Sequence, residues 1–270
     1  MNALIAFFRT IYHHRYLLIQ MTKREISRRY QGSALGFAWS FFYPLLMLVV
    51  YTFVFSVVFK ARWGSGDAKE SRVDFALILF AGLIVFNLFS EIMNNAPFLV
   101  LGNVNYVKKV IFPLEILPLI SIGAVLFHSF ISLLVLITAQ LIFKGFIPFT
   151  IVYFPLILFP LLVIGLGVSW FLAALTVYIR DIVHITSVFT SVLMFISAVF
   201  FPISSLPEKY QTIILLNPLA VIISEARKVL IFGQSPDWAL LALILVFGLF
   251  VASGEYWWFQ KMRKGFADVL

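Results

Sequence analysis

Four histidines are the side chains best suited to acid–base or metal chemistry in this sequence, and their spacing matches neither use. They are His13, His14, His128 and His184, and no H-E-x-x-H or G-x-S-x-G pattern occurs. Cysteine is absent, which excludes disulfides, thiolate metal sites and thiol catalysis. The G-x-x-x-x-G-K-[ST] phosphate-binding loop is missing as well. We therefore predict no catalytic residue, no metal site and no cofactor held by this chain.

One carboxylate, Glu91, interrupts an apolar stretch over residues 75–100. About twenty apolar residues favour membrane insertion by roughly 0.3 to 0.6 kcal/mol each, against a cost of about 3 kcal/mol for one acidic residue at the centre. The stretch is therefore expected to insert with Glu91 in it. Two interpretations stay open, because bonding to a neighbouring helix and facing a polar path would both remove the carboxylate from lipid.

A basic segment precedes the first long apolar run. Residues 15–30 contain no Gly or Pro, and Glu25 is the single acidic residue among them. We predict a basic helix that ends near Gly32. Its charges mark the cytoplasmic side of the membrane, and some of them are also candidates for binding an anionic headgroup at a gate. These gate candidates are Arg15, Lys23, Arg24, Arg28 and Arg29.

Aromatic side chains recur at helical spacing directly after the basic segment. Tyr43, Tyr51 and Phe55 follow one another at intervals of eight and four residues, and Trp39 lies four residues before Tyr43. Such a stripe suits the wall of a passage and the seam of a dimer equally well. Because Phe, Tyr and Trp make up 17% of the sequence, most rings are expected to face lipid. The candidates for a passage are Trp39, Phe42, Tyr43, Tyr51 and Phe55, together with Glu91.

Composition defines the elements that must position these residues. The 270 residues are 62% hydrophobic and 12% charged, with a mean hydropathy of +1.03. One soluble core could not hide so much apolar surface, so the sequence predicts an all-α, polytopic membrane protein. The net charge of +8 is placed beside apolar runs, where it attracts membrane lipid. No separate polar domain carries it, and we expect no nucleic-acid partner.

Six transmembrane helices are predicted, with the N and C termini both cytoplasmic. In this arrangement twelve of the 20 Lys and Arg residues lie on the cytoplasmic side, as the positive-inside rule requires. The predicted spans cover about residues 35–59, 75–100, 116–143, 151–178, 182–201 and 238–259, within a transmembrane domain at 35–260.

Three further segments flank or interrupt the spans. Residues 2–14 are amphipathic and predict an interfacial helix rather than a signal peptide, because Arg9 and His13 break the apolar stretch. With the basic helix they form a cytoplasmic and interfacial unit at 1–34, and residues 261–270 form a cytoplasmic tail. Residues 202–237 combine four prolines with apolar runs too short to cross, which predicts a re-entrant helical pair on the outer side.

The order and spacing of many residues resemble the ABC-2 type permeases that export cell-surface polysaccharides, the Wzm, KpsM and TarG group. The similarity extends over nearly the whole chain. It rests on Arg29, Tyr30, Ser33, Leu35, Gly36, Trp39, Pro44, Leu45, Val54 and Phe55, on Phe112 to Glu115, on Arg180 with Asp181, and on Asn217 with Pro218.

The resemblance implies a half-transporter of the bacterial cytoplasmic membrane. Such permeases form homodimers, bind two copies of a separate ATPase that uses ATP and Mg²⁺, and export lipid-linked polysaccharides of the O-antigen, capsule or teichoic-acid type. By resemblance, residues 15–30 are a gate helix that meets the pyrophosphate of the lipid carrier, and residues 103–112 are the segment that docks on the ATPase. The candidates for ATPase coupling are then Asn103, Tyr106, Lys108, Lys109 and Phe112.

Two other functions remain open at the level of sequence. An ABC-2 exporter of drugs or small amphiphiles would share the fold and differ in the width of its channel. A membrane-embedded glycosyl- or acyltransferase is the alternative of another class. It should carry a cluster of His, Asp or Glu at one membrane face, whereas the acidic residues of this sequence are scattered.

Overall fold

The computed structural model of the chain describes residues 10–58, 63, 72–108 and 112–270. Within these residues the fold consists of helices and turns without strands, so the prediction of an all-α protein is confirmed. The predicted interfacial helix over residues 2–14 falls largely outside the described residues. The basic segment is helix α2, Arg15–Arg28. After it, Gly32 and Gly36 adopt φ values of +82° and +49°, which favour glycine and turn the chain toward the next helix.

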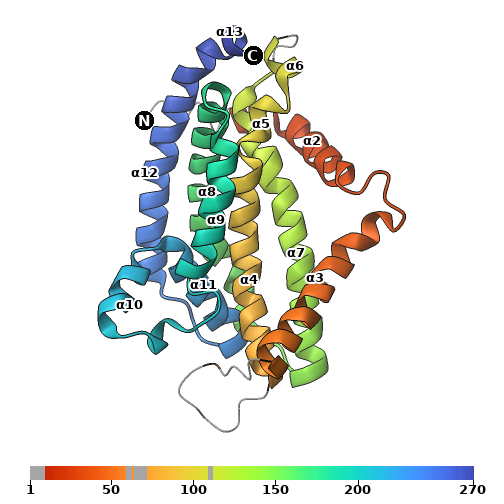
Figure 1. The fold of residues 1–270 in the computed structure, drawn as a ribbon, viewed down its shortest axis with the longest axis vertical. Coiled ribbons are helices and arrows are strands. Elements are labelled where there is room, and N and C mark those ends of the chain that lie inside the picture. The colour runs from red at the N-terminus through yellow and green to blue at the C-terminus, as the bar shows by residue number, and fades with distance from the viewer. Residues whose placement is uncertain (1–9, 59–62, 64–71, 109–111) are drawn as a thin grey trace.

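Five helices among the described residues are long and apolar enough to cross a membrane. Four of them run along the long axis of the molecule, and the one that contains α3 is oblique to it (Figure 1). The first combines a 3-10 turn, helix α3 and a π-helical turn, and two of the others carry prolines near their starts. They are α3 (Trp39–Tyr51) with its flanking turns Gly36–Ala38 and Thr52–Val58, α4 (Arg72–Asn95), α7 (Leu117–Lys144), α8 (Phe154–Tyr178) and α12 (Trp238–Met262).

The predicted fifth span at 182–201 is shorter than expected. Helix α9 covers only Ile182–Ile196, and its 15 residues extend about 22 Å, less than the ~30 Å of a hydrocarbon core. It ends because Ala198 adopts φ 51°, outside the helical region. The count of six spans is therefore not confirmed, since five helices among the described residues meet the requirements for crossing.

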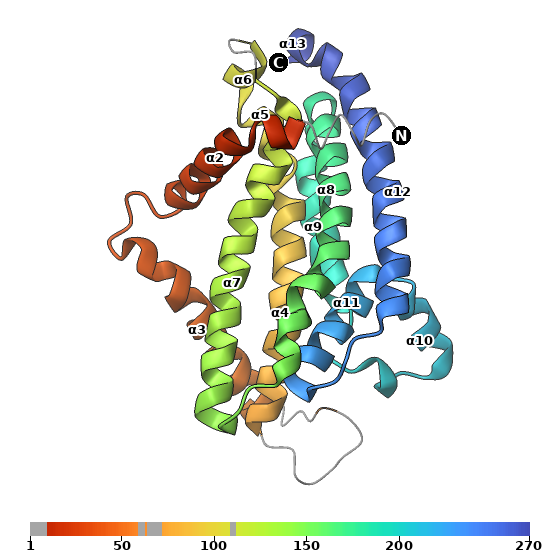
Figure 2. The ribbon, with the colours of Figure 1, turned by 180° about the vertical axis from the view of Figure 1, so that it is seen from behind.

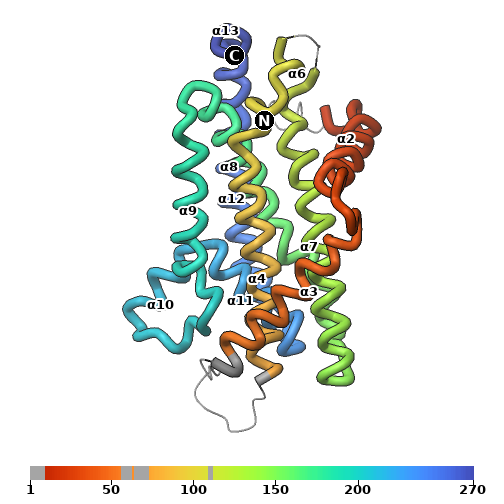
Figure 3. The backbone as a smooth tube through the Cα atoms, turned by 45° about the vertical axis from the view of Figure 1, so that its right-hand side comes forward, coloured from red at the N-terminus to blue at the C-terminus, as the bar shows by residue number. Residues whose placement is uncertain are grey.

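Helix α4 occupies the centre of the bundle, with α3 and α9 on either side of it (Figure 3). Most of its length between Val73 and Asn95 is buried. Helices α7 and α8 also pack against it, while α12 packs along α8 at the edge of the bundle. The helix with the acidic residue is thus surrounded by protein on most sides, which keeps its polar groups away from lipid.

Two short helices lie at one end of the molecule, where the sequence predicts a helical pair. They are α10 (Glu208–Leu215), which is largely exposed, and α11 (Pro218–Arg227), which is largely buried. The Asn217 side chain caps α11 by accepting from the Leu219 N–H at 3.0 Å, and it donates to the Ser197 hydroxyl at 2.9 Å. Entry of this pair into the membrane stays a prediction.

Arg227 fixes α11 to the centre of the bundle. Its guanidinium is 4% exposed and donates to the carbonyls of Ile78 at 3.2 Å and Ala198 at 2.8 Å. It also lies over the ring of Trp63, 4.3 Å from its centroid. The Ala198 carbonyl lies where α9 has ended, so Arg227 satisfies a group left free by the helix end.

The opposite end of the molecule gathers the remaining short helices (Figures 1 and 2). These include α2, α5 (Phe98–Leu101), α6 (Val104–Lys108) and α13 (Phe266–Val269). The basic helix and the candidate ATPase-coupling segment therefore share one end, and the α10–α11 pair lies at the other. Which of the two ends faces the cytoplasm stays a prediction.

Candidate functional site

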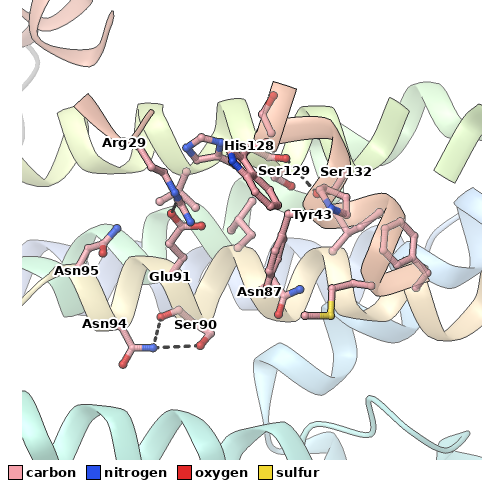
Figure 4. Close-up of a pocket in the computed structure, with 18 of the residues that line it drawn as sticks. Arg29, Tyr43, Asn87, Ser90, Glu91, Asn94, Asn95, His128, Ser129 and Ser132 are labelled. Atoms are coloured by element: carbon pink, nitrogen blue, oxygen red, sulfur yellow. Dashed lines mark hydrogen bonds and ion pairs between the residues drawn. The ribbon is translucent and has the colours of Figure 1, made fainter. Parts of the chain in front are cut away.

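A cavity of about 570 Å³ opens between the end of α2 and helices α3, α4 and α7 (Figure 4). Aromatic rings of α3 form one wall, and polar side chains of α4 and α7 form the others. The residues that matter for its chemistry are Arg29, Tyr30, Trp39, Tyr43, Tyr51, Asn87, Ser90, Glu91, Asn94, Asn95, His128, Ser129 and Ser132.

The polar wall on α4 follows from helical spacing. Asn87, Ser90, Glu91 and Asn94 stand at positions i, i+3, i+4 and i+7, so they share one face. The Asn94 amide donates to the Ser90 carbonyl at 2.8 Å and to the Thr190 hydroxyl of α9 at 3.3 Å. The sequence analysis singled out only Glu91, although this polar periodicity within an apolar span could have identified the other three.

Arg29 and Glu91 form an ion pair at the mouth of the cavity, although 62 residues separate them in the chain. Both also line a second cavity of about 420 Å³, which extends toward α2 and α5. Asn95 and His128 are shared by the two cavities as well. The ion pair therefore stands at the boundary between a space beside the basic helix and a space inside the bundle.

Tyr30 and His128 meet beside this ion pair. The Tyr30 hydroxyl lies 3.0 Å from His128 Nδ1, and the two share a hydrogen bond between the α2–α3 turn and α7. Burial raises the pKa of the Tyr30 phenol, with the charge of Arg29 opposing this effect, so the phenol is protonated at neutral pH. No pattern in the sequence connected His128 with Tyr30, which lies 98 residues away in the chain.

Ser129 has a side-chain hydroxyl without a hydrogen-bond partner among the described residues. Its side chain is 8% exposed and lines the 570 Å³ cavity. Such buried groups normally bind a protein atom, water or ligand. The hydroxyl oxygen itself is buried, so Ser129 contributes its side chain to the cavity wall without exposing this oxygen.

The five aromatic candidates for a passage lie in three different surroundings. Trp39, Tyr43 and Tyr51 line the polar cavity, whereas Phe42 lines a separate apolar cavity of about 850 Å³ between α3 and α7. Phe55 lies between the rings of Phe75 and Phe200, at centroid distances of 6.0 and 5.5 Å. Phe55 therefore packs on α4 and on the segment after α9, and it is not among the described residues that line the polar cavity.

Only Arg29 of the five gate candidates has contacts in the polar cavity. Arg28 pairs with Glu25 at 2.9 Å, and Arg15 donates to the Tyr12 carbonyl at 3.0 Å. Lys23 and Arg24 are exposed on α2.

The candidate coupling residues occupy the end of the molecule that carries α6. The Asn103 side chain donates to the Leu99 carbonyl at 2.9 Å, and the rings of Tyr106 and Phe112 stack at a centroid distance of 4.5 Å. Lys108 is exposed at the end of α6, and Lys109 lies outside the described residues. The stacked rings thus connect α6 with the residues that lead into α7.

The arrangement identifies the class of protein. The chain belongs to the ABC-2 type transporter family, whose sequence pattern matches residues 16–232. This range includes the polar cavity, the ion pair and the α10–α11 pair.

Individual relatives align with nearly the full chain. An "O-antigen export system permease protein RfbA" of Myxococcus xanthus is 27% identical over 98% of this chain and 99% of its own length. A protein of the same name from Klebsiella pneumoniae is 25% identical, over 94% and 95% of the two chains. "Polysialic acid transport protein KpsM" of Escherichia coli is 21% identical, over 84% and 85%.

Proposed function

We propose that this chain is the permease subunit of an ATP-driven exporter that moves a lipid-linked polysaccharide across the bacterial cytoplasmic membrane. The observation that carries the proposal is the similarity, over 98% of the chain, to a protein named as an O-antigen export permease. The substrate would be a glycan of the O-antigen, capsule or teichoic-acid type.

The chemistry of the polar cavity supports a glycan substrate. A sugar presents C–H groups on its faces and hydroxyls on its edges. The rings of Trp39 and Tyr43 offer planes for the faces, and the amides of Asn87 and Asn94 offer donors and acceptors for the edges. A wall of this kind suits the sugar units of a polymer that carries hydroxyl groups.

A homodimer would cover polar side chains that are exposed in a single copy of the chain. Asn87 of α4 and Ser187 and Ser191 of α9 are exposed side chains on helices of the bundle. Polar side chains inside a membrane face protein or a water-filled cavity rather than lipid. A second copy covering this side would enclose the polar groups in a channel. In such a dimer α9 and the turn after it would complete six crossings per chain, with both termini in the cytoplasm.

The energy for transport would come from a separate subunit. The sequence has no phosphate-binding loop, and the ABC-2 family to which it belongs implies an ATPase partner. We propose two copies of this ATPase, with ATP and Mg²⁺ bound by them, docked on the segment that contains Asn103, Tyr106, Lys108, Lys109 and Phe112.

Arg29 is the proposed contact for the pyrophosphate of the lipid carrier. It stands at the boundary of two cavities, and its guanidinium is paired with a carboxylate that an incoming phosphate could replace. We expect the Arg28→Gln/Arg29→Gln variant to insert normally and to lose at least about 90% of export, because one good charge-assisted contact contributes about 1.5 to 3 kcal/mol. Surface glycan is measured by immunoblotting, and membrane level by the abundance of the chain.

The matched control removes the same charge elsewhere. Arg180 and Lys264 are exposed at the same end of the molecule, so the Arg180→Gln/Lys264→Gln variant should export normally. Unchanged export by the Arg28/Arg29 variant would end the gate hypothesis. Deletion of the whole chain tests the function itself. Intact surface glycan in the deletion strain, with retention of a small amphiphile, would instead favour the exporter of drugs or amphiphiles.

A further inference from the structure

Arg263, directly after α12, binds the segment that leads from α6 into α7. Its Nη1 donates to Glu115 Oε2 at 2.7 Å, and its Nη2 lies 3.4 Å from the Phe112 carbonyl. Glu115 is 8% exposed, so its carboxylate is held inside the protein. The contact joins parts of the chain that are 148 residues apart. It was not part of the sequence analysis, which assigned residues 261–270 to a simple tail.

Helix α8 also binds Glu115, through a hydrogen bond to its backbone. Glu115 lies in the 3-10 turn Leu114–Ile116 that opens α7, and its carbonyl accepts from the indole N–H of Trp170 in α8 at 3.1 Å. Trp170 is 2% exposed, so it cannot follow Glu115 without moving the packed helix around it. The start of α7, the middle of α8 and the end of α12 therefore meet at one residue.

The segment after α12 is itself tightly held. The Tyr178 hydroxyl at the end of α8 donates to the Met262 carbonyl at 2.9 Å. A Cβ added at Gly265 would lie 2.7 Å from the same hydroxyl, and Phe266 is fully buried. Figures 1 and 3 show α13 beside α6, in agreement with the contacts between these two helices. The segment that carries Arg263 is thus held in place by its contacts with α8.

A continuous set of contacts leads from the proposed docking surface on α6 to Arg263. The Tyr106 ring of α6 stacks on Phe112 at 4.5 Å with an interplanar angle of 13°, and the Phe112 carbonyl faces Arg263. Guanidinium is planar and rigid, and it can serve a carboxylate and a carbonyl at once, which an ammonium group does with less fixed geometry. A displacement of α6 would therefore reach α12 through Arg263.

We propose that Arg263 and Glu115 are positioning residues that transmit movement of the α6 segment to α7, α8 and α12. The inference rests on the proposed function, because it takes α6 as the place where the ATPase docks. The two residues act on coupling between ATP hydrolysis and transport, and they contact neither the substrate nor the ATPase.

The test compares export with ATP hydrolysis in the complete permease–ATPase complex. Glu115→Gln and Arg263→Gln should leave membrane level and co-purification with the ATPase unchanged. The amount of glycan exported per ATP hydrolysed should fall about tenfold, within the 5- to 150-fold range of typical coupling effects. The Glu115→Arg/Arg263→Glu exchange should restore much of this ratio, because the ion pair is rebuilt. Lys264→Gln is the matched control, since Lys264 is the exposed neighbour of Arg263.

A normal ratio in both single variants at normal membrane level would overturn the positioning role. Loss of co-purification would overturn it too, because the contact would then serve assembly. If a glutamine variant fails to reach the membrane, Arg263→Lys replaces it. A several-fold lower ratio supports the proposal and an unchanged ratio contradicts it. If the unaltered complex exports no glycan, the proposed function is wrong and the coupling role is overturned with it.

Discussion

Arg29 and Glu91 form an ion pair at the boundary between two cavities, and this contact bears on the role expected of each residue. Each had two interpretations in the sequence. For Arg29, the orientation signal and the gate contact are compatible, because the side chain that marks one face of the membrane also reaches the polar cavity. Glu91 contacts a neighbouring segment through Arg29 and lines two cavities, and its place in a transport path stays a prediction.

The hydrogen bond between Tyr30 and His128 gives a prediction at the scale of single residues. A double-mutant cycle with Tyr30→Phe and His128→Leu should yield a coupling energy of about 0.6 kcal/mol, and at most about 1.7 kcal/mol, as polar pairs in membrane proteins do. The free energy of unfolding is measured in detergent by titration with a denaturing detergent. Tyr16→Phe, on an exposed ring of α2, should change stability by less than about 0.5 kcal/mol. A coupling energy of zero would show that the bond contributes nothing.

At the scale of elements, small residues decide how closely the helices approach. Helices α8 and α12 pack along each other through Gly167 and Ala252. In a membrane, helix association depends on such close packing, because lipid tails are as apolar as the side chains they replace. The position of α12, and with it Arg263, therefore depends on a glycine far from the candidate site.

Gly167→Ala is predicted to destabilise the protein by about 1 to 3 kcal/mol. The added Cβ would lie 2.9 Å from the Ala252 Cα, and a backbone atom cannot move aside as a flexible side chain can. Gly254→Ala is the control on α12, since no described atom outside its own helix turn lies within 4 Å of its Cβ position. It should stabilise the helix by up to about 1 kcal/mol. Equal unfolding midpoints for the two variants would contradict the packing explanation.

At the scale of the whole molecule, the two ends have different constructions. The end with α2, α6 and α13 carries exposed basic side chains such as Arg28, Lys108 and Lys264, and Arg263 binds Glu115 there. The other end carries α10 and α11, held to the bundle by the buried Arg227. Helices between them leave Asn87, Ser187 and Ser191 exposed on one side. A transporter that works between two compartments needs such different ends, and the proposed homodimer would cover these polar residues.

We expect the purified complex to contain two copies of the 30.8 kDa chain and two ATPase subunits. The reason is the exposed polar side of the bundle, which one copy cannot shield from lipid. Native mass spectrometry from detergent gives the stoichiometry directly. A complex with a single copy of the chain would contradict the homodimer and would require another protein to cover this side.

Much of the architecture could be predicted from the sequence because its causes are local. Apolar runs of 20 or more residues become helices long enough to cross, and a helix without Gly or Pro continues from Arg15 to Arg28. Glycines at 32 and 36 then allow a turn. The end of α9 was not predictable in this way, since the carbonyl freed near Ala198 depends on Arg227 from another helix.

The composition and the lengths of the apolar runs determined that this protein is a helical membrane protein with a basic end. Tertiary structure alone decided which side chains meet. It brought Arg29 to Glu91 and Arg263 to Glu115, and it placed a polar cavity beside Tyr43 and an apolar one beside Phe42. The physical reason is that helical periodicity acts within a few turns of one segment. Contacts between segments depend on the rotation and axial position of each helix, which only packing fixes.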